Sequence, residues 1–216
     1  MEQIDMSKTQ LAAPELAAID VQGLTRGSFL VKGALAAGAV YGTSLVSPLV
    51  SRAVAQEGDV GILNFALSLE YLEATFYERA LKEVSGMSTE VKELAQEIQE
   101  HEAQHVESLG EAIQDLGGTP DKAPQVDFGN AFSSENTFLK TAATFENVGV
   151  GAYNGAAPSI KNPKVLGSAG AIVQIEARHV ALIALQRGES ITPDGAFAKA
   201  LSQKKVLTAV KPFIKS

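Results

Sequence analysis

The sequence predicts an all-α protein, a four-helix bundle made of two antiparallel hairpins joined by a long crossover. Four long segments after residue 58 repeat apolar residues at helical spacing, and stretches with Gly or Pro end each segment. The connections inside the first and the last pair of segments are short, which favours antiparallel neighbours. The middle connection, of about 16 residues, is long enough to cross the bundle.

Composition restricts the chemistry of this chain. Of its 216 residues, 45% are hydrophobic and 20% are charged, which supplies enough apolar material for one sizeable core. The net charge of −7 argues against a nucleic-acid partner. Because the chain has no cysteine, it cannot form disulfides or thiolate metal sites. A metal ion would have to be held by carboxylates and by the three histidines.

The first 55 residues have the layout of an export signal. A basic start precedes the uncharged run 33–50, and small residues follow up to Ala55. Four residues match a twin-arginine signal: Thr25, Arg26, Phe29 and Leu30. Gly27 stands in place of the second arginine. We expect cleavage after Ala55 and export to the periplasm, the cell envelope or the medium. A retained membrane anchor over 33–50 is the alternative.

The bundle is expected over residues 56–188, with helices at 59–84, 89–117, 134–156 and 164–187. Ser88 is placed to begin the second helix, Pro158 follows the third and Gly188 ends the fourth. Residues 189–216 are expected to form a C-terminal tail. Within this tail we predict a short helix over 196–201 and an apolar segment over 206–214 that docks on the bundle.

Two of the predicted helices carry the same motif, Glu-x-x-His. It comprises Glu102 and His105 in the second helix, and Glu176 and His179 in the fourth. Residues three apart lie on one helical face, so each motif can direct a carboxylate and an imidazole to one ion. One such pair arises easily by chance. Two pairs that use two of only three histidines predict a metal site.

The first and third helices carry a second repeated spacing. Glu70 precedes Tyr77 by seven residues, and Glu146 precedes Tyr153 by seven residues. Seven residues are about two helical turns, so each tyrosine lies on the face of its glutamate. We therefore expect Glu70 and Glu146 to complete the metal site, with the two tyrosines as neighbours of the ligands.

In all four helices these polar residues lie within an apolar stripe. Four carboxylates that face a core repel one another unless cations lie between them. Two divalent ions would nearly balance four carboxylates, and the mixture of oxygen and imidazole donors suits iron, with manganese as the alternative.

Each residue taken singly has a plainer interpretation. A single glutamate of these motifs could lie on the surface, a single histidine could be a hydrogen-bonded core residue, and a single tyrosine could serve packing alone. Glu73 could share the face of Glu70, so Glu70 is the least secure ligand. His101 has no counterpart in the fourth helix, where Ile175 stands, and we expect it beside the ligands or exposed.

These motifs resemble the ferritin-like superfamily of di-iron carboxylate bundles, over about residues 59–187. The resemblance implies two iron ions held by Glu70, Glu102, His105, Glu146, Glu176 and His179, with Glu102 and Glu176 as bridges. The exported location and the ending at 206–214 are similar to the desiccation-related branch of that superfamily. The tail does not resemble the fifth helix of cage ferritins.

The resemblance implies an oxidoreductase of ferroxidase or peroxidase type, in which the metals react with O2 or peroxide in stress protection. One alternative is a metal-binding stress protein without turnover, and another is a structural bundle. A homo-oligomer is compatible with each of them. We expect contact with a membrane only if the segment 33–50 is retained.

Overall fold

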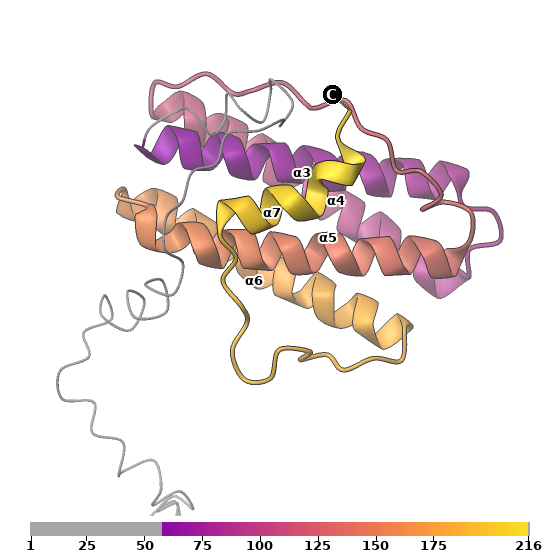
Figure 1. Cartoon of the computed structure of the whole chain (residues 1–216). Helices are drawn as coiled ribbons and strands as arrows, with labels where there is room; N and C mark the ends of the chain where they lie inside the picture. The colour runs from indigo at the N-terminus through magenta and orange to yellow at the C-terminus, as the bar shows by residue number, and fades with distance from the viewer. Residues whose placement is uncertain (1–57, 216) are drawn as a thin grey trace, which may run out of the picture. The chain divides into compact units, whose positions relative to one another are not determined.

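The computed structural model describes residues 58–215, in which four long helices form the bundle (Figure 1). They are α3 (Gly58–Glu83), α4 (Thr89–Asp115), α5 (Glu135–Ala156) and α6 (Pro163–Gln186). Helix α3 packs chiefly on α4, and α5 packs chiefly on α6. The predicted fold class of two hairpins joined by a crossover is therefore confirmed. The predicted export signal lies outside the described residues.

The helices begin at side chains that accept hydrogen bonds from free backbone N–H groups. Ser88 precedes α4 and accepts from Val91 N at 3.4 Å, and Asn162 precedes α6 and accepts from Lys164 N at 2.9 Å. Ser134 and Thr137 form a capping box at the start of α5. These local signals explain why the predicted bounds agree with the observed ones to within one or two residues.

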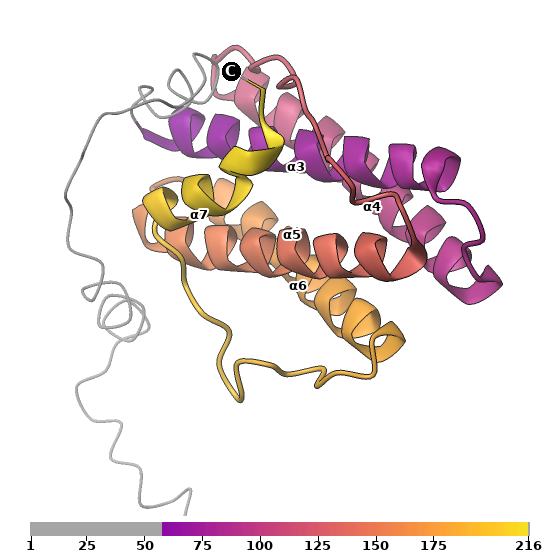
Figure 2. The ribbon, with the colours of Figure 1, turned by 45° about the vertical axis from the view of Figure 1, so that its right-hand side comes forward.

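The crossover between α4 and α5 runs along the bundle (Figure 2). It contacts α3 through hydrogen bonds and through aromatic packing. The side chain of Asn64 donates to Thr119 O at 3.2 Å and accepts from Asp121 N at 2.8 Å. Further along, Phe128 and Phe132 are buried against Phe76 of α3. The crossover therefore contributes part of the core.

The tail folds differently from the prediction. Residues 196–201 form a turn and irregular chain, and the helix lies instead at α7 (Gln203–Val210), followed by the short helix η4 (Lys211–Phe213). Leu201 approaches α5 so closely that its N–H donates to Gly151 O at 2.8 Å. A Cβ at Gly155 would lie 1.9 Å from Leu201 O. The expected helix over 196–201 is thus replaced by irregular chain, and Leu201 at its end packs against Gly151 and Gly155 of α5.

Helix α7 lies on α5, as both ribbon views show (Figures 1 and 2). Val206 and Val210 of this helix are buried in the core. The ring of Phe213 packs edge-on against Phe145 of α5, with ring centroids 4.7 Å apart. The segment 206–214 is therefore held by apolar contacts with the bundle.

The apolar core comprises two clusters, which on α4 lie on either side of a polar layer. On α4, Val91, Ala95 and Ile98 belong to one cluster, and Leu109 and Ile113 belong to the other. The Glu-x-x-His motif of α4 falls between these two sets. By length and composition α6 is apolar enough to cross a membrane, yet its buried face carries a glutamate and a histidine.

Candidate metal centre

All six residues predicted to bind metal are buried and come from the four helices of the bundle. Their exposed fractions are Glu70 1%, Glu102 0%, His105 8%, Glu146 0%, Glu176 0% and His179 2%. Helical spacing directs each of them inward, because each lies in the apolar stripe of its helix. Burial of four carboxylates in one core is costly without positive partners, so this layer requires an explanation beyond packing.

The six residues form two overlapping groups that could each hold an ion. One group contains Glu70, Glu102, His105 and Glu176, and the other contains Glu102, Glu146, Glu176 and His179. Within each group the candidate ligand atoms all lie within 4.8 Å of one another. Glu102 and Glu176 belong to both groups, which is the arrangement that two bridging carboxylates require.

His105 directs one ring nitrogen at three carboxylates. Its Nδ1 lies 3.2 Å from Glu70 Oε2, 3.3 Å from Glu102 Oε2 and 3.1 Å from Glu176 Oε1. Burial alone would lower the pKa of His105, but its close contacts with these carboxylates raise it to about 12. Without metal the ring is therefore a cation at neutral pH, and it partly balances the glutamates.

His179 occupies the equivalent place in the second group. Its Nδ1 lies 3.1 Å from Glu146 Oε2 and 3.1 Å from Glu102 Oε1. Burial lowers the pKa of this histidine, but the hydrogen bond and the charge of Glu146 outweigh burial, so its pKa is raised. In both histidines Nδ1 faces the carboxylates, which leaves Nε2 to face away from them.

The pKa values of the buried glutamates shift in two directions. Burial and the charges of neighbouring carboxylates raise the pKa of Glu102 and Glu176 well above the ordinary range. Burial also favours the neutral form of Glu70, but hydrogen bonds from His105 and other neighbours lower its pKa overall. Without metal, the cluster thus retains protons that cations would displace.

The cluster has unused acceptors that fit divalent ions. Glu102 Oε1 and both carboxylate oxygens of Glu176 are buried. Two of these oxygens lie 3.1 Å from a histidine Nδ1, but among residues 58–215 none of the three has a partner in hydrogen-bond geometry. Buried oxygens without donors are rare in proteins, because they lose hydration without replacement. Four carboxylates and two imidazoles, with unused oxygens on both shared glutamates, form a donor set suited to iron or manganese.

The two tyrosines pair crosswise. Tyr77 of α3 donates to Glu146 of α5, and Tyr153 of α5 donates to Glu70 of α3 at 2.5 Å. Burial and the charge of each partner raise the pKa of both hydroxyls well above the ordinary value, so both remain protonated donors. Each tyrosine lies on the face of its own helix's glutamate, as the spacing predicted, but it holds the glutamate of the opposite helix.

Glu73 is a further buried carboxylate at the cluster, with an exposed fraction of 3%. Burial and the charges of Glu176, Glu146 and neighbouring glutamates raise its pKa well above the ordinary range. A Cβ at Gly149 would lie 2.9 Å from Glu176 Oε2 and 3.4 Å from Glu73 Oε1, so the glycine leaves room for both. The sequence signal for Glu73 was its spacing of three residues from Glu70, which places both on one face of α3.

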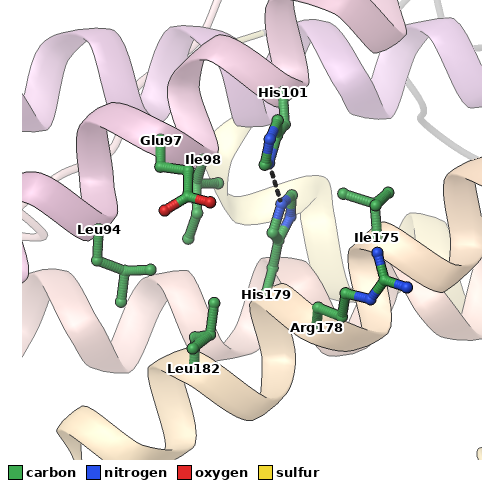
Figure 3. Close-up of a pocket in the computed structure, with 8 residues that line it drawn as sticks. All are labelled: Leu94, Glu97, Ile98, His101, Ile175, Arg178, His179 and Leu182. Atoms are coloured by element: carbon green, nitrogen blue, oxygen red, sulfur yellow. Dashed lines mark hydrogen bonds between the residues drawn. The ribbon is translucent and has the colours of Figure 1, made fainter.

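His101 lies against one histidine of the cluster. Its Nδ1 is 3.1 Å from His179 Nε2, and the two rings stack with centroids 5.3 Å apart (Figure 3). When Nδ1 of His179 binds a metal ion, the ring proton lies on Nε2, so Nε2–H donates and His101 accepts. In the described part of the chain, Nε2 of His105 has no such partner, so the two groups differ in how their histidine is held.

The comparisons with known proteins agree with this geometry. Residues 58–189 match a family described as "Ferritin-like domain". The chain belongs to this family. No curated protein matches the chain. The ferritin-like domain includes the whole of α3, α4, α5 and α6, and with them every residue of the buried cluster, whereas α7 lies beyond the matched residues.

Proposed function

We propose that this ferritin-like protein binds two divalent ions in the buried cluster, iron in the first place and manganese as the alternative. The observation that carries the proposal is that Glu102 and Glu176 belong to both candidate groups and keep oxygens without hydrogen-bond partners. Glu70 and His105 would complete one position. Glu146 and His179 would complete the other, as in the di-iron carboxylate bundles.

We propose an oxidoreductase chemistry for the loaded centre, of ferroxidase or peroxidase type. Two ferrous ions would supply the two electrons that, with two protons, reduce one hydrogen peroxide to two waters. The protein's part is to exclude water through the two apolar clusters and to orient the ligands. Tyr77 and Tyr153 orient Glu146 and Glu70 by donating to them from the opposite helix.

We further propose that the protein acts outside the cytoplasm, as a member of the desiccation-related branch. The support is in the sequence: the signal-like segment 1–55 and the ending at 206–214. Determination of the N-terminus of the protein recovered from its native cell envelope would test this part. An N-terminus at Gln56 would support export with cleavage, and an intact Met1 in a soluble cytoplasmic fraction would refute it.

The metal proposal is tested by titrating the metal-free full chain with Fe(II) without oxygen, and then adding air or peroxide. We expect about two irons per chain, followed by oxidation visible as near-ultraviolet absorbance. The variant with both His105→Ala and His179→Ala should bind almost none. Loading without oxidation would support the binding protein without turnover, and full retention of iron by the double variant would refute the ligand assignment.

A further inference from the structure

A hollow of about 300 Å³ lies between α4 and α6, next to the candidate metal centre (Figure 3). Its walls are mainly aliphatic, from Leu94 and Ile98 of α4 and from Ile175 and Leu182 of α6. His101 and His179 also line it. It is therefore a recess that reaches from the surface of the bundle to a residue of the cluster.

His179 connects this hollow with the centre. One edge of its ring, at Nδ1, is 3.1 Å from Glu146, and the other edge, at Nε2, is 3.1 Å from His101. The ring is itself only 2% exposed, so it separates the carboxylates from the hollow by the thickness of one side chain. A small molecule in the hollow would thus lie beside the His179 group, and not beside the His105 group.

The walls of the hollow favour a small uncharged occupant. Four aliphatic side chains offer no replacement for the hydration shell of a cation, which makes passage of a hydrated metal ion costly. The two charged residues at the rim, Glu97 and Arg178, have opposite signs and do not select one charge. Figure 3 shows the guanidinium of Arg178 directed away from the two histidine rings.

A second hollow does not reach the cluster. It lies at α5, the end of α6 and the chain that follows, where Asn147, Val180 and Asp194 are among its lining residues. None of the six candidate ligands lines it, although its volume of about 540 Å³ is larger. Of these two hollows, only the one between α4 and α6 is therefore placed to serve the centre.

We propose that the hollow between α4 and α6 is the access site through which small neutral oxidants, dioxygen or hydrogen peroxide, reach the centre on its His179 side. This inference rests on the proposed function, because it requires a metal-loaded centre. It adds a direction of approach and a chemical class of ligand. The proposal also implies that metal ions enter the centre by a different path, because the aliphatic walls make passage of a hydrated ion costly.

Leu182 and Leu166 provide a matched test on α6. Their exposed fractions are 39% and 38%, but only Leu182 lines the hollow. Leu182→Trp should fill the hollow, and Leu166→Trp should add the same bulk elsewhere on the helix. Leu182→Ala should widen the hollow. Because both leucines are half-exposed, all three variants should fold, which circular dichroism and thermal unfolding would check.

The probe is nitric oxide, a neutral diatomic that changes the visible absorbance of ferrous ions, mixed in a stopped-flow instrument with the Fe(II)-loaded full chain. We expect Leu182→Trp to slow binding by about tenfold, equivalent to about 1.4 kcal/mol in the barrier. Leu182→Ala should leave binding as fast or faster, and Leu166→Trp should match the wild type. Iron stoichiometry should be unchanged in all three variants.

Separate mixing with dioxygen and with hydrogen peroxide then shows which oxidant uses the hollow, and slowing of either by Leu182→Trp supports the proposal. Equal rates for Leu182→Trp and Leu166→Trp with all three molecules would overturn it while leaving the metal site intact. Failure of the wild-type chain to bind iron would overturn the proposed function, and this inference with it. The two failures are thus distinguished by the metal count alone.

Discussion

The hydroxyl of Tyr77 donates a hydrogen bond to the carboxylate of Glu146, although the two residues belong to different hairpins of the bundle. Tyr153 and Glu70 form the reciprocal pair at 2.5 Å. Each tyrosine thereby fixes a candidate ligand across the interface between α3 and α5. The two bonds link the halves of the bundle at the centre itself, where the ligands must be held in place.

Removal of one of these hydroxyls should weaken the fold and the centre together. Tyr77→Phe leaves a buried Glu146 oxygen without its donor, so we expect a loss of about 1–3 kcal/mol in the free energy of unfolding. Urea unfolding of the metal-free protein measures it. Tyr71→Phe is the control, because Tyr71 is also on α3 but has no hydrogen bond within the described residues. Equal losses for the two variants would argue against a specific role for Tyr77.

His101 should matter to one metal position and not to the other. Its Nδ1 can accept from Nε2–H of a metal-bound His179, and outer partners of metal-bound histidines typically contribute about 10- to 100-fold to affinity. We therefore expect His101→Ala to weaken one of two Co(II) binding steps by about that factor and to alter the visible Co(II) spectrum. His101→Asn, which restores an acceptor, should recover part of the loss. Equal weakening of both steps would contradict this asymmetry.

Glu70 and Glu73 can be distinguished by amide substitution. Glu70 lies in one candidate metal group and has a lowered pKa, whereas burial raises the pKa of Glu73 well above the ordinary range. The neutral form of Glu73 is thus favoured, and a glutamine has the same shape and charge as that form. Glu73→Gln should therefore leave iron stoichiometry and stability nearly unchanged. Glu70→Gln should reduce bound iron, as counted after gel filtration. The reverse result would exchange the roles of the two residues.

Gly149 should be required for its small size. A Cβ there would lie 2.9 Å from Glu176 Oε2, so Gly149→Ala should displace a shared carboxylate and weaken binding of both ions. Gly110→Ala on α4 is the control, because a Cβ at that position has nothing within 4 Å. That control should be stabilised by up to about 1 kcal/mol through helix propensity. Calorimetric metal titration of the two variants would reveal the difference.

The metal-free protein should lose stability as the pH rises from about 5 to 8. Glu102 and Glu176 have a pKa well above 4.5, and His105 has a pKa raised from 6.5 to about 12. In this range the folded chain retains protons that the unfolded chain releases, so rising pH favours unfolding. Glu70, with its lowered pKa, acts in the opposite sense only below about 4.5.

Bound metal should reverse this trend, because the ions replace the protons of the cluster and their affinity rises with pH. Denaturant midpoints of the metal-free and metal-loaded protein at several pH values would test both signs. Parallel curves for the two forms would contradict binding at the titrating cluster. The double variant with His105→Ala and His179→Ala should show no effect of metal at any pH.

The sequence by itself determined the four helices and the six inward-facing residues. Helical periodicity assigns each residue to a face of its own helix, and Ser88 marks the start of α4, where its side chain accepts from Val91 N. The repeated Glu-x-x-His motif then points two carboxylates and two imidazoles into the core. These inferences need only spacing along one helix, which the chain carries locally.

The tertiary structure decided what each residue meets across an interface. Periodicity could not distinguish Glu70 from Glu73, since residues three apart share a face, nor could it pair Tyr77 with Glu146 on another helix. It could not show that His101 contacts His179. It also could not show that residues 196–201 form irregular chain beside the glycines of α5 instead of the expected helix. Each of these depends on the relative position of two segments of the chain, which is set by packing between them.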